Sequence, residues 1–129
     1  MINAFIQEIE EAISNSSIVV SSTIQKYFGS SKKEAYISGD LLFIDMSSFE
    51  FAVYITERGR KVIFDKYRLQ YMDSQNRLVF RYDNAPHYKD IPVFPNHKHL
   101  HDGKVISATP PKLSEILEEI TALIAQSSQ

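Results

Sequence analysis

The chain has 129 residues, a formal net charge of −2 and no cysteine. This length fits one domain, and the missing cysteines exclude disulfides, thiolate catalysis and cysteine-based zinc sites. No apolar run is long enough to cross a bilayer, and the acidic, periodic start MINAFIQEIEEAI does not have the pattern of a signal peptide. We therefore expect residues 1–129 to form a single cytoplasmic domain with no membrane association.

The first predicted element is an amphipathic helix over residues 2–14. Ile2, Ile6, Ile9 and Ile13 recur at helical spacing, and the glutamates between them are left for solvent. Such a helix needs an apolar surface on which to bury its isoleucine face.

The middle of the chain has the pattern of an antiparallel sheet built from hairpins. Runs rich in Ile, Val, Phe and Tyr alternate with the polar breaks DMSS, ERGR and DSQN, whose lengths suit hairpin loops. The predicted strands lie near residues 18–28, 36–45, 49–56, 61–72 and 77–83. With a helix at each end of the chain, this pattern predicts an α+β fold with a meander sheet of about five strands.

The last of these hairpins can be given a register. If DSQN is a four-residue loop, the apolar face pairs Tyr71 with Leu78, Leu69 with Phe80 and Tyr67 with Tyr82. The polar face then pairs Gln70 with Val79, Arg68 with Arg81 and Lys66 with Asp83. A change of phase within residues 61–66 predicts a bulge near Asp65. The polar face would form a charged platform.

All four histidines and three of the five prolines lie in residues 84–108. The prolines disfavour a regular strand in the first half, which we expect to wrap the edge of the sheet. The second half is expected to straighten, so that His97, His99 and His101 share one side and alternate with Lys98. Residues 105–107 then form a short strand.

The chain closes with a second predicted amphipathic helix, residues 111–126. Its apolar residues repeat at helical spacing from Leu113 to Ile124. Thr109 is a cap candidate, and Pro110 and Pro111 suit a first helical turn.

Positive charge gathers in the second half of the chain. Ten of the fourteen Lys and Arg residues lie between Glu57 and Lys104, against six acidic residues, while both predicted helices carry glutamates. This placement indicates either a basic face that meets a polyanion or an ordinary mixed-charge surface.

These motifs resemble the TumE family, the proposed toxin halves of bacterial type II toxin–antitoxin pairs. The resemblance is carried by RLVFRYDNAPH, then FPNHKH, then the acidic helix LSEILEEI, and runs from about Phe51 to Ile120. It implies a small cytoplasmic toxin with a helix-turn-helix antitoxin that binds and silences it, and with RNA as its target. Tyr88 and Asn96 stand where the family often has further histidines.

A ribonuclease that works without metal needs a base for the 2′-hydroxyl, an acid for the 5′-oxygen and cations for the phosphate. Histidine suits both proton-transfer roles because its ordinary pKa is near 6.5. The candidate catalytic residues are His87, His97, His99, Arg81 and Asp83, where Asp83 orients an imidazole or pairs with Lys66. The candidates for RNA contact are Lys66, Arg68, Lys98, Tyr88 and His101, with Tyr82 and Phe94 as further stacking rings.

Metal binding is an alternative for the same histidines. On a strand His97 and His99 lie about 6.6 Å apart at Cα on one face. They could share a divalent ion, with His87 or Asp83 as a third ligand. His101 could not easily join them from an unbroken strand.

Three further alternatives stay open. Residues 82–84 could serve only to end a strand, with Tyr82 in the core and Asp83 bonded to nearby backbone. The protein could also act without catalysis, by sequestering a nucleic acid, a metal or its antitoxin. Finally, the predicted strand 18–28 has few charges to prevent pairing between copies, so a homodimer is open.

Overall fold

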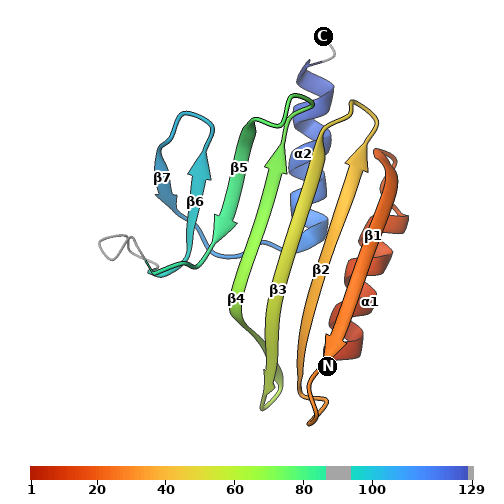
Figure 1. The fold of residues 1–129 in the computed structure, drawn as a ribbon, viewed down its shortest axis with the longest axis vertical. Helices are drawn as coiled ribbons and strands as arrows, with labels where there is room; N and C mark the ends of the chain where they lie inside the picture. Colours follow the sequence, from red (N-terminus) through yellow and green to blue (C-terminus); the bar gives the residue numbers. More distant parts are fainter. Residues whose placement is uncertain (87–93, 128–129) are drawn as a thin grey trace.

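The computed structural model describes residues 1–86 and 94–127. Within them lie two helices and seven strands: α1 (Ile2–Ser14), β1 (Val19–Phe28), β2 (Glu34–Phe43), β3 (Ser48–Arg58), β4 (Lys61–Met72), β5 (Leu78–Asp83), β6 (His97–Leu100), β7 (Val105–Ser107) and α2 (Leu113–Ser127). The strands form one antiparallel sheet in chain order, and both helices lie against the same face (Figure 1). The predicted α+β meander is confirmed, with seven strands in place of about five.

The two additional strands come from the segment rich in histidine and proline. β6 starts at His97, where the chain was expected to straighten, and β7 coincides with the short strand predicted at residues 105–107. β6 pairs with β5 on one side and with β7 on the other. The segment therefore extends the sheet beyond the five strands that hydrophobic alternation indicates.

The core lies between the helices and one face of the sheet. The four isoleucines of α1 are buried there, as are Ile116, Leu117, Ile120 and Ile124 of α2. Alternate residues of β2 to β5 meet them, including Phe43, Phe49, Ile55, Tyr71 and Tyr82. Since side chains alternate across a strand, the remaining residues of β2 to β5 form the open face, which neither α1 nor α2 covers.

The β4–β5 hairpin has a different register from the predicted one. Tyr71 pairs with Phe80 and Leu69 with Tyr82, two positions away from the expected partners. One position comes from a five-residue loop, closed by the bond from the Asp73 N–H to the Arg77 carbonyl at 2.9 Å. The other comes from a bulge beside Tyr71. Because the total shift is even, the apolar and polar faces stay as predicted.

This shift changes the partners on the open face. Arg81 lies opposite Gln70, and Asp83 lies opposite Arg68. The predicted pairs of Arg68 with Arg81 and of Lys66 with Asp83 are therefore wrong. The observed register avoids two like charges facing each other.

The predicted bulge near Asp65 is confirmed, and Asn84 holds it in place. Tyr54 pairs with Lys66, but the next pair is Ile55 with Phe64. The Asn84 side chain accepts a hydrogen bond from the Tyr67 N–H at 3.1 Å and donates one to the Asp65 carbonyl at 3.0 Å. The Asn84 side chain thus extends the hydrogen bonding between β4 and β5 by one residue, and β5 ends there.

α2 begins at Leu113, two residues later than predicted. The carboxylate of Glu115 accepts a hydrogen bond from the Lys112 N–H at 2.9 Å, which makes Lys112 the N-cap. Pro110 and Pro111 therefore precede the helix. Among the described residues, neither α1 nor α2 has the length and apolar character to cross a membrane.

Candidate active site on the open sheet face

Four of the candidate catalytic side chains meet on the open face where β5 and β6 pair. Arg81 lies opposite His99, and Asp83 lies opposite His97. Residues two apart on a strand point to the same side, so this pairing makes a two-by-two block. Arg81, Asp83, His97 and His99 are referred to below as the histidine–aspartate cluster.

The carboxylate of Asp83 is the centre of this cluster. Its Oδ1 lies 2.8 Å from His97 Nε2, and its Oδ2 lies 3.2 Å from His99 Nε2 and 3.1 Å from Arg81 Nε. The Ala85 N–H also donates to Oδ1 at 3.0 Å. A buried carboxylate is destabilised by loss of water unless hydrogen bonds and nearby positive charge replace it, and these partners do so for Asp83. The same contacts set the orientation of both imidazole rings.

His97 is fully buried, although it lies on the open face. Its Nδ1 is 2.9 Å from the Pro95 carbonyl oxygen, which can only accept, so Nδ1 carries a hydrogen. This bond directs Nε2 toward Asp83 and toward His99 Nε2, which is 3.1 Å away. His97 is therefore placed to organise the cluster and is out of reach of a large substrate.

His99 is the more accessible of the two imidazoles, with 16% of its side chain exposed. Burial lowers the pKa of His99, and the neighbouring Arg81 guanidinium lowers it further, against the opposing effect of Asp83. His101 does not join the cluster: it lies exposed in the turn after β6.

The cluster forms one wall of an open pocket. Lys66 and Arg68 of β4 also line this pocket, as do Pro86 and Pro95. Arg68 bonds the Glu50 carboxylate at 2.8 Å, with about half of each side chain exposed. Lys66 is also exposed. The pocket therefore combines buried titratable groups with surface cations, as an anionic ligand requires.

Lys98 lies on the opposite side of β6 from the histidines. Its ammonium is 2.8 Å from Glu119 Oε2 of α2 and lies over the rings of Phe80 and Tyr82 at 4.8 and 4.7 Å. Burial disfavours its charge, but hydrogen bonds to Glu119 and Tyr82 outweigh burial and raise the pKa of Lys98. It anchors β6 to α2, so the structure does not bring it to the pocket as a phosphate contact.

Of the remaining candidate site residues, some are described by the structure and others lie outside the described residues. Tyr82 is a core residue, and its hydroxyl donates to Glu119 Oε1 at 3.0 Å. Phe94 is exposed. His87 and Tyr88, predicted for catalysis and for RNA contact, lie outside the described residues.

Sequence reasoning did not identify two of the supporting side chains. Gln70 Oε1 accepts a hydrogen bond from Arg81 Nη1 at 3.3 Å. Asn96 Oδ1 accepts one from the buried hydroxyl of Tyr67 at 2.8 Å. Gln70 would have been found from the correct register, whereas no local pattern signals Asn96.

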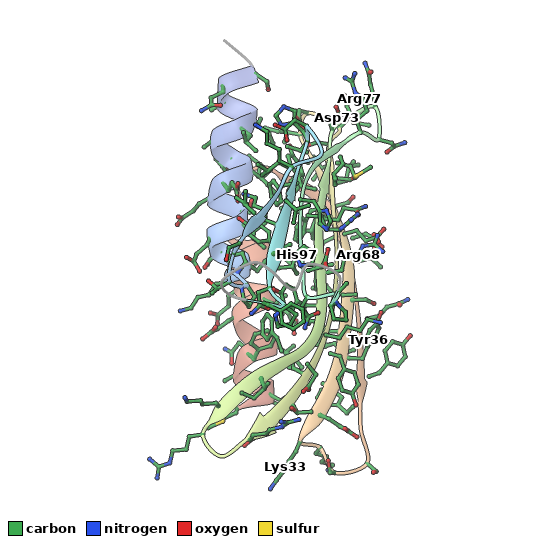
Figure 2. All side chains as sticks on the ribbon, turned by 90° about the vertical axis from the view of Figure 1, so that its left-hand side faces the viewer. Lys33, Tyr36, Arg68, Asp73, Arg77 and His97 are labelled. Carbon is green, nitrogen blue, oxygen red and sulfur yellow. The ribbon has the colours of Figure 1, made fainter. Side chains whose placement is uncertain are left out.

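A row of tyrosines on the open face was also missed. Tyr27, Tyr36 and Tyr54 lie opposite one another across β1, β2 and β3, and Lys66 continues the row on β4. All three tyrosines are exposed. Figure 2 shows Tyr36 and Arg68 on the side of the sheet away from the helices. The row leads from the sheet edge toward the pocket.

Comparison with known proteins identifies a family. A protein-family model described as Toxin TumE matches residues 9–127, nearly the whole chain. No curated protein and no solved structure matches significantly. The match covers α2, all seven strands and the second half of α1 from residue 9 on, so it includes the histidine–aspartate cluster. The chain belongs to the TumE family of toxins.

Proposed function

We propose that this toxin cleaves RNA, with the histidine–aspartate cluster as its reaction centre. The observation that supports the proposal is the convergence of one carboxylate, two imidazoles and one guanidinium within hydrogen-bond distance, in a pocket that is also lined by Lys66 and Arg68. Perturbed titratable groups in a pocket with cations are typical of sites for phosphoryl chemistry.

We assign the roles within the cluster from the exposure of the side chains. Of the two imidazoles in the cluster, His99 is the one that a substrate can approach, so we assign to it the role of accepting the proton of the attacking hydroxyl. Arg81, with 31% of its side chain exposed, is placed to stabilise charge on the phosphate. His97 and Asp83 position these two groups. His87 remains the candidate acid for the leaving oxygen.

The substrate class we propose is single-stranded RNA. Unpaired bases stack on exposed aromatic rings, while lysine and arginine neutralise the phosphates. Tyr27, Tyr36 and Tyr54 supply such rings in one row, and Lys66 and Arg68 supply cations between that row and the cluster. A strand of RNA following the row would bring a phosphate to the pocket.

A toxin family implies an antitoxin partner. We propose a helix-turn-helix antitoxin that covers the open face with an acidic helix or tail, because the pocket side of that face is basic. We also propose that the toxin acts in the cytoplasm. Self-pairing through β1 is a further proposal, since β1 is an edge strand whose Val20, Tyr27 and Phe28 are exposed. Sedimentation of the toxin alone tests it.

The test of cleavage is to map cellular RNA ends after brief expression of the toxin and of its His99→Ala variant. New ends are expected with the wild type and not with the variant. His101→Ala is the matched control, because it removes an exposed histidine outside the cluster. Purified protein should cleave the same RNA in vitro.

Two results would contradict the proposal. Growth inhibition that persists in His99→Ala, with unchanged RNA ends, would separate toxicity from the cluster. Growth inhibition without any new RNA ends in the wild type would favour the alternative, a module that binds nucleic acid and sequesters it. In that case Arg68→Ala should relieve toxicity more than His99→Ala.

A further inference from the structure

We propose that Asp83, His97 and His99 form a binding site for one divalent transition-metal ion. Each residue offers one ligand atom, and these atoms all lie within 4.8 Å of one another. Asp83 and His97 are buried and His99 is half-buried, unlike the exposed acidic groups that often gather without an ion. Metal binding is measurable without RNA, so this site stands or falls separately from the proposed cleavage.

The spacing of the ligand atoms supports the proposal. His97 Nε2 lies 3.1 Å from His99 Nε2 and 2.8 Å from Asp83 Oδ1, and His99 Nε2 lies 3.2 Å from Asp83 Oδ2. An ion held at about 2.1 Å from nitrogen and oxygen ligands puts neighbouring ligands of an octahedron about 3.0 Å apart. Each imidazole nitrogen is nearest to a different oxygen of Asp83, so the neighbouring separations among these four atoms are close to those of ligands around one ion, and one ligand atom from each residue lies within 4.8 Å of the others.

The surroundings hold these ligands in place. The Pro95 carbonyl fixes the tautomer of His97 by accepting from Nδ1, which leaves Nε2 as the ligand atom. Arg81 Nε and the Ala85 N–H each donate a hydrogen bond to the Asp83 carboxylate and so fix its orientation. Such outer contacts accompany metal-binding histidines and carboxylates in general and set their orientation.

The donor set indicates which ions fit. Two imidazoles and one carboxylate suit Mn²⁺, Fe²⁺, Co²⁺, Ni²⁺ or Zn²⁺ better than Mg²⁺ or Ca²⁺, which prefer oxygen ligands throughout. A site with three protein ligands leaves further positions for water or a phosphate oxygen. The positive charge of Arg81 beside the carboxylate opposes the ion, so we expect micromolar affinity rather than tighter binding.

An ion at this site would change the role of His99. The same Nε2 lone pair cannot bind a metal and accept a proton. A bound divalent ion instead lowers the pKa of a water ligand, so a metal-bound hydroxide would take the place of His99 as the base.

The experiment uses full-length, untagged toxin treated with EDTA and then dialysed. Titration with ZnCl2, NiCl2 and MnCl2 is followed by calorimetry and by thermal melting. We expect one equivalent of Zn²⁺ or Ni²⁺ to bind and to raise the melting temperature by several degrees. His99→Ala and Asp83→Asn should each weaken binding at least tenfold, and the control His101→Ala should not.

The outcomes are decisive in either direction. Absence of heat and of any melting shift with all three ions overturns the site, and so does an affinity that His99→Ala leaves unchanged. Because His99 lies on the open face, outside the core under the helices, and keeps 16% of its side chain exposed, its variant should melt cooperatively without metal and remain informative if Asp83→Asn does not fold. Metal binding by a protein that does not cleave RNA would confirm this site and contradict the proposed nuclease.

Discussion

The anchor between β6 and α2 gives the sharpest test of how the fold supports the cluster. Lys98 Nζ lies 2.8 Å from Glu119 Oε2, and 14% and 34% of the two side chains are exposed. Removing one partner of a fully buried ion pair costs about 3–5 kcal/mol, whereas an exposed pair is worth less than about 1 kcal/mol. The exposure of this pair lies between that of a fully buried pair and that of an exposed pair, so we expect an intermediate cost. We therefore expect Glu119→Ala to lower the free energy of unfolding by about 2 kcal/mol.

The assay is thermal and urea unfolding of purified variants. A loss of about 2 kcal/mol corresponds to a fall in melting temperature of roughly 8 °C for a domain of this size. The double variant Lys98→Met with Glu119→Leu should recover part of the loss, because it replaces both charges with apolar groups but leaves the Tyr82 hydroxyl without its Glu119 acceptor. Lys104→Ala is the control, since it removes an exposed pair with Asp102 whose atoms are 3.8 Å apart and keeps the hydrogen bond from the Lys104 N–H to the Asp102 carboxylate. If Glu119→Ala unfolds no more easily than Lys104→Ala, the ion pair does not anchor β6.

Three further predictions concern the bulge and the open face. Asn84→Ala removes two hydrogen bonds to the backbone of β4 and should cost about 1–2 kcal/mol of stability in urea unfolding, and Asn84→Asp should not restore it, because a carboxylate oxygen would face the Asp65 carbonyl oxygen in place of the amide donor. Tyr36→Ala should weaken binding of a single-stranded RNA oligonucleotide about tenfold in fluorescence anisotropy, whereas Met46→Ala, at an exposed turn, should leave it unchanged. Arg68→Ala should weaken binding of all sequences alike and reduce the slope of log affinity against log salt by about 0.7, the value for one phosphate contact on a single strand. An unchanged slope would place the phosphates elsewhere.

Patterns along the chain determined the elements and their faces. The period of the isoleucines predicted which side of α1 is buried, and the phase change near Asp65 predicted the bulge. Alternation along a strand was enough to place His97 and His99 on one side and Lys98 on the other. These features depend on the geometry of single helices and strands, so a local reading could find them.

Only the tertiary structure decided which residues face each other. The partners of Arg81 and Asp83 depend on a five-residue loop and a bulge, and each of these moves the register by one position without any change in the alternating pattern. The complete burial of His97 depends on packing around its ring, which includes the bond to the Pro95 carbonyl. The anchoring of Lys98 depends on Glu119 of α2, about twenty residues further along the chain. The tyrosine row likewise exists only through the registers of three hairpins. Contacts between strands are fixed by loop lengths and by packing against distant elements, and a periodic pattern carries no information about either.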